Sequence, residues 1–196
     1  MGDVELAVAA IRAGRPVVLP TDTVYGLCAN TDADAVAGIQ RLKGRAETTP
    51  IALLTLYVEA VIDRIPELRG RFEAIARVLL PGPYTLVLPN PARRLSWLAG
   101  DTIGIRVPVL PARTRQVLVG VGVVAATSAN LHGGPDPRTL ADVPEEIRAA
   151  CAAVLDGGEL PGVPSTVIDL TGPEPIVLRE GAVTAAEALA RIAAAS

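Results

Sequence analysis

Apolar residues along the chain alternate between short β-branched runs and longer stretches where polar and apolar residues mix with helical spacing. The short runs predict strands at residues 16–20, 51–55, 85–89, 103–107, 121–127, 165–170 and 175–178. The mixed stretches predict helices at residues 4–13, 34–42, 68–80, 111–119, 144–150 and 184–194. Strands that alternate with helices are typical of an α/β fold, in which helices cover a sheet.

The connections between these elements are short and carry Pro and Gly at turn-forming positions, as at residues 81–83 and 133–135. None is long enough to link two domains. The chain has 196 residues, and 50% of them are hydrophobic, which suffices for one substantial core. We therefore predict a single domain over residues 1–196.

Charge and cysteine content narrow the class of protein. A formal net charge of −3 argues against broad nucleic-acid binding, which needs a basic face. Residues 117–126, the longest uncharged apolar stretch, fall short of the roughly 20 residues that span a bilayer. Cys28 and Cys151 lie far apart and outside any metal or redox spacing, and the N-terminus lacks the basic region of a signal peptide. We expect a cytoplasmic protein with reduced thiols and no membrane span.

Common catalytic signatures are missing from the sequence. There is no G-x-x-x-x-G-K-[ST] loop, G-x-S-x-G elbow, H-E-x-x-H pair or C-x-x-C pair. Residues 120–125 approach a dinucleotide fingerprint but precede a strand instead of following one. The single histidine, His132, leaves little material for a histidine-dependent triad or a His-rich metal site. We predict no metal held by protein side chains alone.

Polar residues follow apolar runs at several places, and α/β folds hold ligands at such strand ends. The run at 16–20 leads into TDTVYG at 21–26, which suits a capped turn as well as a binding loop. Lys43 and Arg45 precede the run at 51–55, either as a cradle for an anion or as a solvated helix end. Lys43 is the only lysine beside 17 arginines, and an ammonium is not interchangeable with a guanidinium at a phosphate.

Two further groups of polar residues at the ends of predicted strands lie later in the chain. The run at 121–127 ends in Ser128 and Asn130, followed by a glycine-containing loop whose backbone N–H groups can bind an anion. Ser165 begins one late strand, and Arg179 ends the other, where a lone arginine is also common on a surface.

Seven segments in order carry a family resemblance: PTDTVYGL at 20–27, KGR at 43–45, PGPYT at 81–85, IRVP at 105–108, TSAN at 127–130, PSTVIDL at 164–170 and LREG at 178–181. Together they resemble the threonylcarbamoyl-AMP synthase family, also called the YrdC or TsaC family. The match covers nearly the whole chain, and PTDTVYGL followed by TSAN and STVID is highly specific.

The resemblance implies an α/β fold with an open, strongly twisted mixed sheet and helices around one deep cationic cavity. It also implies a nucleotidyltransferase that condenses L-threonine, bicarbonate and ATP into threonylcarbamoyl-AMP and pyrophosphate. The product serves the N6-threonylcarbamoyl modification of adenosine 37 in tRNA, and a second enzyme transfers the group. The chain resembles the stand-alone catalytic form, with Mg²⁺ bound mainly through the ATP phosphates.

The resemblance further implies roles for particular residues. Threonine would be held by Tyr25, Arg106 and Ser165. ATP would be held by Lys43, Arg45, Thr49, Thr102, Ser128, Asn130, Asp136 and Arg179, with Lys43 and Arg45 as the catalytic residues.

Two alternatives stay open at this point. A paralogue of the same superfamily could use the cavity to bind RNA, including double-stranded RNA, or a nucleotide without making the adenylate. A carbamoyl-transfer module of the hydrogenase-maturation type contains a related domain, but within a much longer chain that has zinc-finger and acylphosphatase-like parts.

Overall fold

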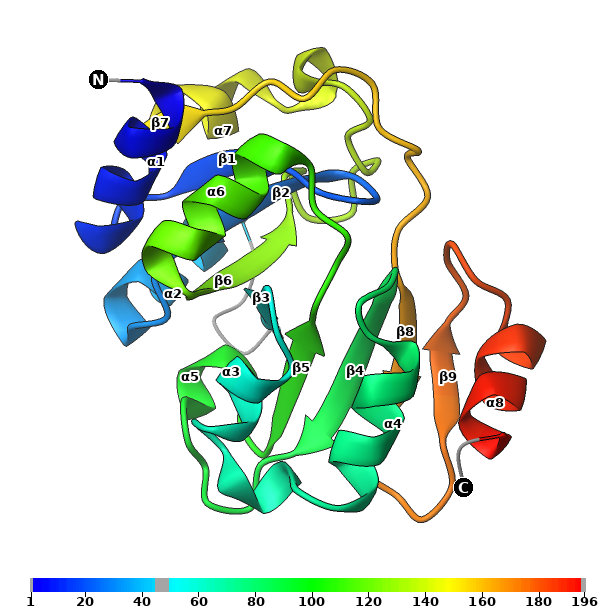
Figure 1. Ribbon diagram of the computed structural model, residues 1–196. Helices are drawn as coiled ribbons and strands as arrows, with labels where there is room; N and C mark the ends of the chain where they lie inside the picture. Colours follow the sequence, from blue (N-terminus) through cyan, green and yellow to red (C-terminus); the bar gives the residue numbers. More distant parts are fainter. Residues whose placement is uncertain (1, 45–49, 195–196) are drawn as a thin grey trace.

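The computed structural model describes residues 2–44 and 50–194 (Figure 1). Its centre is one mixed sheet of nine strands in the order β7-β1-β2-β6-β3-β5-β4-β8-β9. The sheet is open and strongly twisted, so the predicted α/β fold class is confirmed. The two ends of the described chain lie at opposite corners of the molecule (Figure 1).

The first half of the sheet is built on a hairpin of β1 (Val17–Pro20) and β2 (Tyr25–Ala29). The two-residue β7 (Ala153–Val154) pairs parallel with β1 at the outer edge. On the inner side, β6 (Val123–Ser128) pairs antiparallel with β2 and, on its other edge, with β3 (Ala52–Thr55).

The second half of the sheet starts at β3, which pairs parallel with β5 (Thr102–Arg106). Beyond it, β4 (Tyr84–Pro89) runs antiparallel to β5 and parallel to β8 (Thr166–Asp169). The antiparallel β9 (Ile176–Arg179) closes this edge. The connection from β7 to β8 runs down one side of the molecule and joins the two halves (Figure 1).

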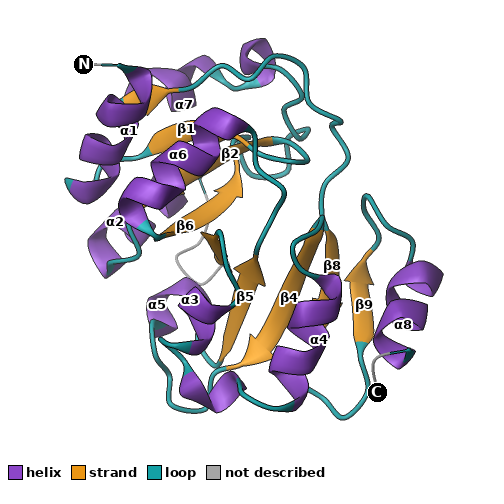
Figure 2. Cartoon of the chain, in the orientation of Figure 1, coloured by secondary structure: helices purple, strands orange, loops and turns teal. Residues whose placement is uncertain are grey.

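The helices cover the sheet in two groups. α1 (Asp3–Arg12) packs against α6 (Ala112–Val121) in the first half, and α4 (Arg71–Leu79) against α8 (Ala185–Ala193) in the second (Figure 2). In α1 the apolar residues Ala7, Ala10 and Ile11 are spaced so that they share one face of the helix, and this face is buried. The remaining elements are α2 (Ala33–Leu42), α3 (Glu59–Ile62), α5 (Ser96–Ala99), α7 (Glu145–Ala150) and the 3₁₀ turns η1 (Pro66–Leu68) and η2 (Leu140–Asp142).

The predicted elements recur within a few residues, but the sequence pattern does not predict the strands β2 and β7, the four-residue helices α3 and α5 or the 3₁₀ turn η2. The first two residues of β2 belong to the TDTVYG segment, for which the sequence indicates a capped turn or a binding loop. All five of its residues are buried because β1 and β6 pair with its two edges. Among the described residues, no helix combines the length and apolar character needed to cross a membrane.

Gly181 offers a test of the close packing between the β9 end and the start of β8. A Cβ at this position would lie 2.1 Å from the Pro164 carbonyl oxygen and 2.6 Å from the Ser165 carbonyl carbon. We expect Gly181→Ala to lower the free energy of unfolding by about 1–3 kcal/mol, because backbone must shift to admit the methyl group.

Urea denaturation measures this change, with Gly38→Ala as the matched control. A Cβ at Gly38, inside α2, meets nothing within 4 Å, and alanine stabilises a helix interior by up to about 1 kcal/mol relative to glycine. Equal stability of the two variants would contradict the packing described here.

Candidate functional site

A cavity of about 390 Å³ lies on one face of the sheet and crosses the junction between its two halves. Its walls come from alternate residues of neighbouring strands, such as Thr102, Gly104 and Arg106 of β5, because successive side chains of a strand point to opposite faces. The lining residues are Thr23, Val24, Pro50, Ile51, Ala52, Thr85, Val87, Ala99, Thr102, Gly104, Arg106, Ala126, Thr127, Ser128, Asp136, Pro164, Ser165, Val167, Leu178 and Arg179.

The floor of the cavity is a row of small residues. The strand register places Ala52 directly opposite Gly104 of β5 on one side and opposite Ala126 of β6 on the other. A Cβ on Gly104 would lie 3.3 Å from the Ala52 Cβ and 3.8 Å from Thr85 Cγ2. Three adjacent strands therefore leave space above the sheet where larger side chains would fill it.

One wall of the cavity carries hydroxyl groups and a guanidinium at the β4, β8 and β9 strands. The hydroxyls of Thr85 and Ser165 lie 2.7 Å apart. Arg179 Nη2 donates to the Ser165 carbonyl oxygen at 2.9 Å, and it lies 3.4 Å from the Ser165 hydroxyl. Arg179 is thus held at the strand end with its charge beside the Ser165 hydroxyl.

The opposite wall includes the tip of the β1–β2 hairpin. The Thr21 hydroxyl donates to the Val24 carbonyl oxygen at 2.6 Å and accepts the Thr23 and Val24 N–H groups at 3.3 Å each, which fixes the turn. At this tip Asp22 Oδ1 accepts from Arg106 Nη2 at 2.9 Å. The same Nη2 lies 3.1 Å from the Thr23 hydroxyl.

The Asp22–Arg106 ion pair is largely removed from water, with the side chains 11% and 13% exposed. Burial raises the pKa of Asp22, and the positive charge of Arg106 opposes that rise without cancelling it. Burial likewise lowers the pKa of Arg106, against the attraction of Asp22. Desolvation therefore outweighs the attraction within the pair, as is common for buried ion pairs.

A third part of the site is the loop that follows β6. The Ser128 hydroxyl donates to Asn130 Oδ1 at 2.7 Å, and Asn130 Nδ2 donates to the Gly134 carbonyl oxygen at 2.6 Å. The Lys43 ammonium, 1% exposed, donates to the Asn130 carbonyl oxygen at 2.6 Å, to Asn130 Oδ1 at 2.8 Å and to the Ser128 carbonyl oxygen. Three acceptors match the three N–H bonds of an ammonium. The Lys43 ammonium therefore holds the loop after β6 in place through these hydrogen bonds.

The structure brings six of the sequence-predicted residues together in the cavity: Thr102, Arg106, Ser128, Asp136, Ser165 and Arg179. Lys43 and Asn130 are not lining residues but hold the loop that carries Ser128. Arg45 and Thr49 lie outside the described residues. The described lining thus holds two arginines, Arg106 and Arg179, and one carboxylate, that of Asp136.

Tyr25 does not line the cavity, although the family resemblance assigned it to threonine. It is fully buried, and its hydroxyl accepts from the Gly157 N–H at 2.9 Å and lies 3.0 Å from Asp156 Oδ1 and 2.8 Å from the Gly158 carbonyl oxygen. These contacts tie β2 to the segment after β7. Burial also raises the pKa of the Tyr25 hydroxyl.

Sequence reasoning did not name the other lining residues as site residues, among them Thr23, Thr85 and Gly104. Thr23 stands in the PTDTVYGL motif two residues before Tyr25. The motif alone does not show that Thr23 lines the cavity and Tyr25 does not, because this difference depends on where the hairpin turn ends. A usable signal existed for Gly104, since it lies two residues before Arg106 in a predicted strand and shares its face.

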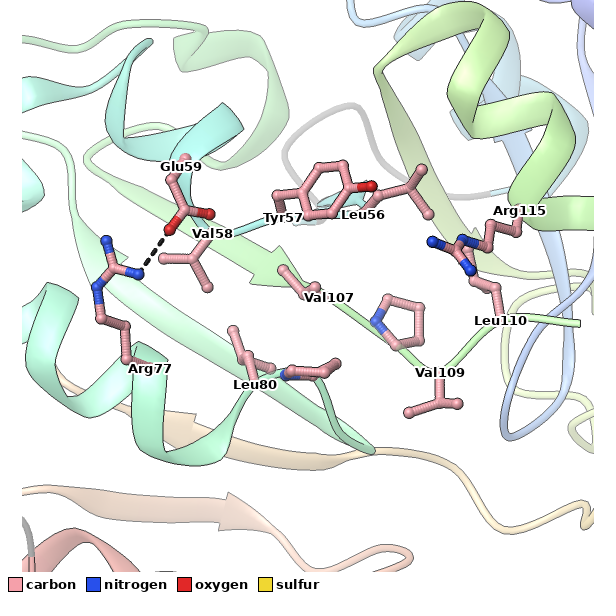
Figure 3. A pocket seen from close by; sticks show the side chains of 12 residues that line it. Leu56, Tyr57, Val58, Glu59, Arg77, Leu80, Val107, Val109, Leu110 and Arg115 are labelled. Atoms are coloured by element: carbon pink, nitrogen blue, oxygen red, sulfur yellow. Dashed lines mark hydrogen bonds and ion pairs between the residues drawn. The ribbon is translucent and has the colours of Figure 1, made fainter.

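A second cavity, of about 500 Å³, lies near the ends of β3 and β5 (Figure 3). Its lining is mainly aliphatic, and at one end Arg77 Nη1 lies 2.5 Å from Glu59 Oε1. None of the sequence-predicted site residues lines it. Because it lacks the convergent hydroxyls of the first cavity, we assign the functional site to the first.

The described residues contain no group of three or more His, Cys, Asp or Glu side chains that could hold a metal ion. Asp136 is the one carboxylate on the described lining of the first cavity. Any divalent cation at this site would therefore take most of its ligands from a bound substrate and from water.

Comparison with known proteins assigns the family. Residues 9–181 match the Sua5/YciO/YrdC family model, which is described as telomere recombination. The chain belongs to this family, as its motifs predicted. Residue for residue it is 36% identical over 182 residues to the threonylcarbamoyl-AMP synthase of Pyrococcus abyssi, a match that covers 91% of this chain and 54% of the relative.

Two further relatives agree with this assignment. A putative threonylcarbamoyl-AMP synthase of Mycobacterium tuberculosis H37Rv is 38% identical over 186 residues, covering 91% of this chain and 83% of the relative. The crystal structure of P. abyssi Sua5 complexed with L-threonine superposes with a TM-score of 0.88 at 34% identity, covering 98% of this chain and 58% of that one. This chain thus spans little more than half the length of the archaeal relative.

The contacts of Lys43 predict that removing its ammonium makes the loop after β6 less ordered. Lys43→Met keeps an unbranched stem but leaves the Ser128 and Asn130 oxygens without their ammonium donor. We expect the free energy of unfolding to fall by about 1–3 kcal/mol, the usual cost of unpaired buried polar groups. Amide hydrogen exchange across residues 128–134 should accelerate more than exchange in α1.

Arg41→Met is the matched control, because Arg41 is exposed in the last turn of α2, the helix whose C-cap is Lys43. Its stability should stay within about 0.5 kcal/mol of the parent, as for most surface substitutions. Unchanged exchange in the Lys43 variant would show that the ammonium does not hold the loop.

Proposed function

We propose that this chain is an L-threonylcarbamoyladenylate synthase, which condenses L-threonine, bicarbonate and ATP into threonylcarbamoyl-AMP and pyrophosphate. The observation that carries the proposal is one cavity that combines two arginines with hydroxyl groups from five segments of the chain. The family assignment and the threonine complex of the P. abyssi relative support it.

Arg106 is the proposed partner of the threonine carboxylate, because a guanidinium can donate two parallel hydrogen bonds to that group. Thr23 and Ser165 flank the same space and offer hydroxyls to the polar atoms of the amino acid. The small floor residues leave room above the sheet for a ligand to lie against it. Tyr25 does not line the cavity, and its contacts support the β1–β2 hairpin that carries Thr23.

The nucleotide is proposed to lie beside Arg179, Ser128, Thr102 and Asp136. Arg179 offers positive charge to the phosphates, while the Ser128 loop presents a hydroxyl and backbone groups. Lys43 acts here by ordering that loop. A contribution of Arg45 and Thr49 to ATP binding stays a prediction.

The chemistry needs positioning more than proton transfer. The threonine amine is carboxylated to a carbamate, whose oxygen attacks the α-phosphorus of ATP while pyrophosphate leaves. Both reactants are anions, so fixed guanidinium groups that face them lower their mutual repulsion in the transition state. Enclosing the reactants in a cavity also slows hydrolysis of the carbamate and the adenylate.

Mg²⁺ is proposed to enter with ATP, held mainly by the phosphates and water. Oxygen ligands suit this hard cation, and Asp136 is the one carboxylate on the described lining that can approach it. When bound, it neutralises charge on the phosphates.

The product is proposed to pass to tRNA-modifying machinery that installs the N6-threonylcarbamoyl group on adenosine 37. A cytoplasmic location and weak RNA binding, including double-stranded RNA, remain predictions from the sequence. Nothing in the described lining favours an RNA-binding paralogue over the synthase.

The decisive experiment measures pyrophosphate release from ATP and Mg²⁺ with threonine and bicarbonate each present or omitted, and determines the mass of the nucleotide product. We expect release that requires both substrates, with the mass of threonylcarbamoyl-AMP. Release without this dependence from folded protein would refute the synthase and favour the nucleotide- or RNA-binding paralogue.

Gly104→Val tests whether the small floor defines the ligand space. Valine suits a strand, so the fold should persist, while its methyl groups project into the cavity beside Ala52. We expect pyrophosphate release at fixed substrate concentrations to fall about 10-fold or more, because displaced reacting groups lose effective molarity. Gly38→Ala serves as the control, and full activity of Gly104→Val would remove the floor from the substrate site.

A further inference from the structure

The Asp22 carboxylate is not used by the proposed reaction, yet it occupies a constrained position. It sits at the tip of the β1–β2 hairpin, and the tip is fixed by the Thr21 hydroxyl. Its partner Arg106 belongs to β5, which is separated from β2 in the sheet by β6 and β3. The ion pair thus spans the cavity side of two intervening strands.

The guanidinium of Arg106 is held asymmetrically. Its Nη2 donates to Asp22 Oδ1 at 2.9 Å and lies 3.1 Å from the Thr23 hydroxyl. Its Nε is buried and has no hydrogen-bond partner among the described residues. A buried N–H without a partner is costly, so such a group indicates a place where a ligand atom completes the bonding.

A free arginine side chain at the end of β5 could adopt many rotamers and would lose that freedom on binding an anion. A carboxylate bonded to one terminal nitrogen removes this cost in advance and fixes the plane of the guanidinium. The short Asp22–Nη2 contact does this from outside the cavity lining, since Asp22 is not itself a lining residue.

We propose that Asp22 is a positioning residue, whose carboxylate holds Arg106 by Nη2 so that the remaining N–H groups bind the carboxylate of the amino-acid substrate. This inference rests on the proposed function and adds to it the residue that orients the amino-acid anchor. Asp22 contributes no atom to the reaction.

The test compares Asp22→Asn with the parent chain in the pyrophosphate-release assay, varying L-threonine and ATP separately. Asparagine keeps the shape but loses the charge-assisted bond. We expect KM for L-threonine to rise about 10-fold or more, since misplaced binding groups cost up to about 100-fold. KM for ATP should change less than about 2-fold, because Asp22 bonds to Arg106, which is the proposed threonine contact and not a proposed nucleotide contact.

Calorimetric titration with L-threonine and L-threoninamide separates orientation from a general loss of structure. The amide lacks the carboxylate, so Asp22→Asn should weaken L-threonine binding far more than L-threoninamide binding. Asp22→Glu retains a carboxylate and should recover part of the loss. Asp3→Asn is the matched control, because it breaks an exposed 2.5 Å contact with Arg113 outside the cavity and should leave both KM values unchanged.

Each outcome decides the matter. Equal losses for the two ligands, or unchanged affinity for L-threonine, would overturn the positioning role. Tighter L-threonine binding in Asp22→Asn would also overturn it, because Asp22 would then merely offset the charge of Arg106. Absence of threonine-dependent release from the parent chain would instead overturn the synthase proposal and this inference with it.

Discussion

The structure depends on the antiparallel pairing of β6 with both of its neighbours. In the order of the sheet, the β6–β3 contact is the ladder that joins the hairpin half to the half containing β5, β4 and β8. Residues 123–126 are all buried, as expected for a strand covered on both faces. The cavity lies across this junction, so its shape is set where the two halves meet.

Few charged residues line the cavity, and its two described arginines are each held by a neighbouring residue. Arg106 is bonded to Asp22, and Arg179 to the Ser165 carbonyl oxygen. Groups that are already oriented need not reorganise when an anion arrives, which is how proteins make electrostatic attraction effective. The cost appears as desolvation of Asp22 and Arg106, seen in the directions of their pKa shifts.

The sequence allowed prediction of the fold because its strands are short apolar runs between clear turn residues. The same approach missed β2, since pairing on both edges by β1 and β6 makes a strand of residues that follow a polar segment. Motifs identified Arg106 and Ser165 as cavity residues. They could not separate Thr23 from Tyr25, because that distinction depends on where the hairpin turn ends and the strand begins.

Lys43 is a second residue whose place near the site was predicted from the sequence but whose structural role was not. The KGR motif indicated a cation near an anion site, but the burial of the Lys43 ammonium against the 128–130 loop follows only from its tertiary contacts with Ser128 and Asn130. Its role as a fastener of the loop requires three acceptors that come from residues more than 80 positions away.

The burial of Lys43 also has a practical consequence. Since it is the only lysine of the chain and only 1% exposed, the folded protein presents no lysine amine to acylating reagents in its described surface. Acylation of this side chain requires the loop after β6 to open. The rate at which Lys43 is acylated therefore measures how often the loop after β6 opens.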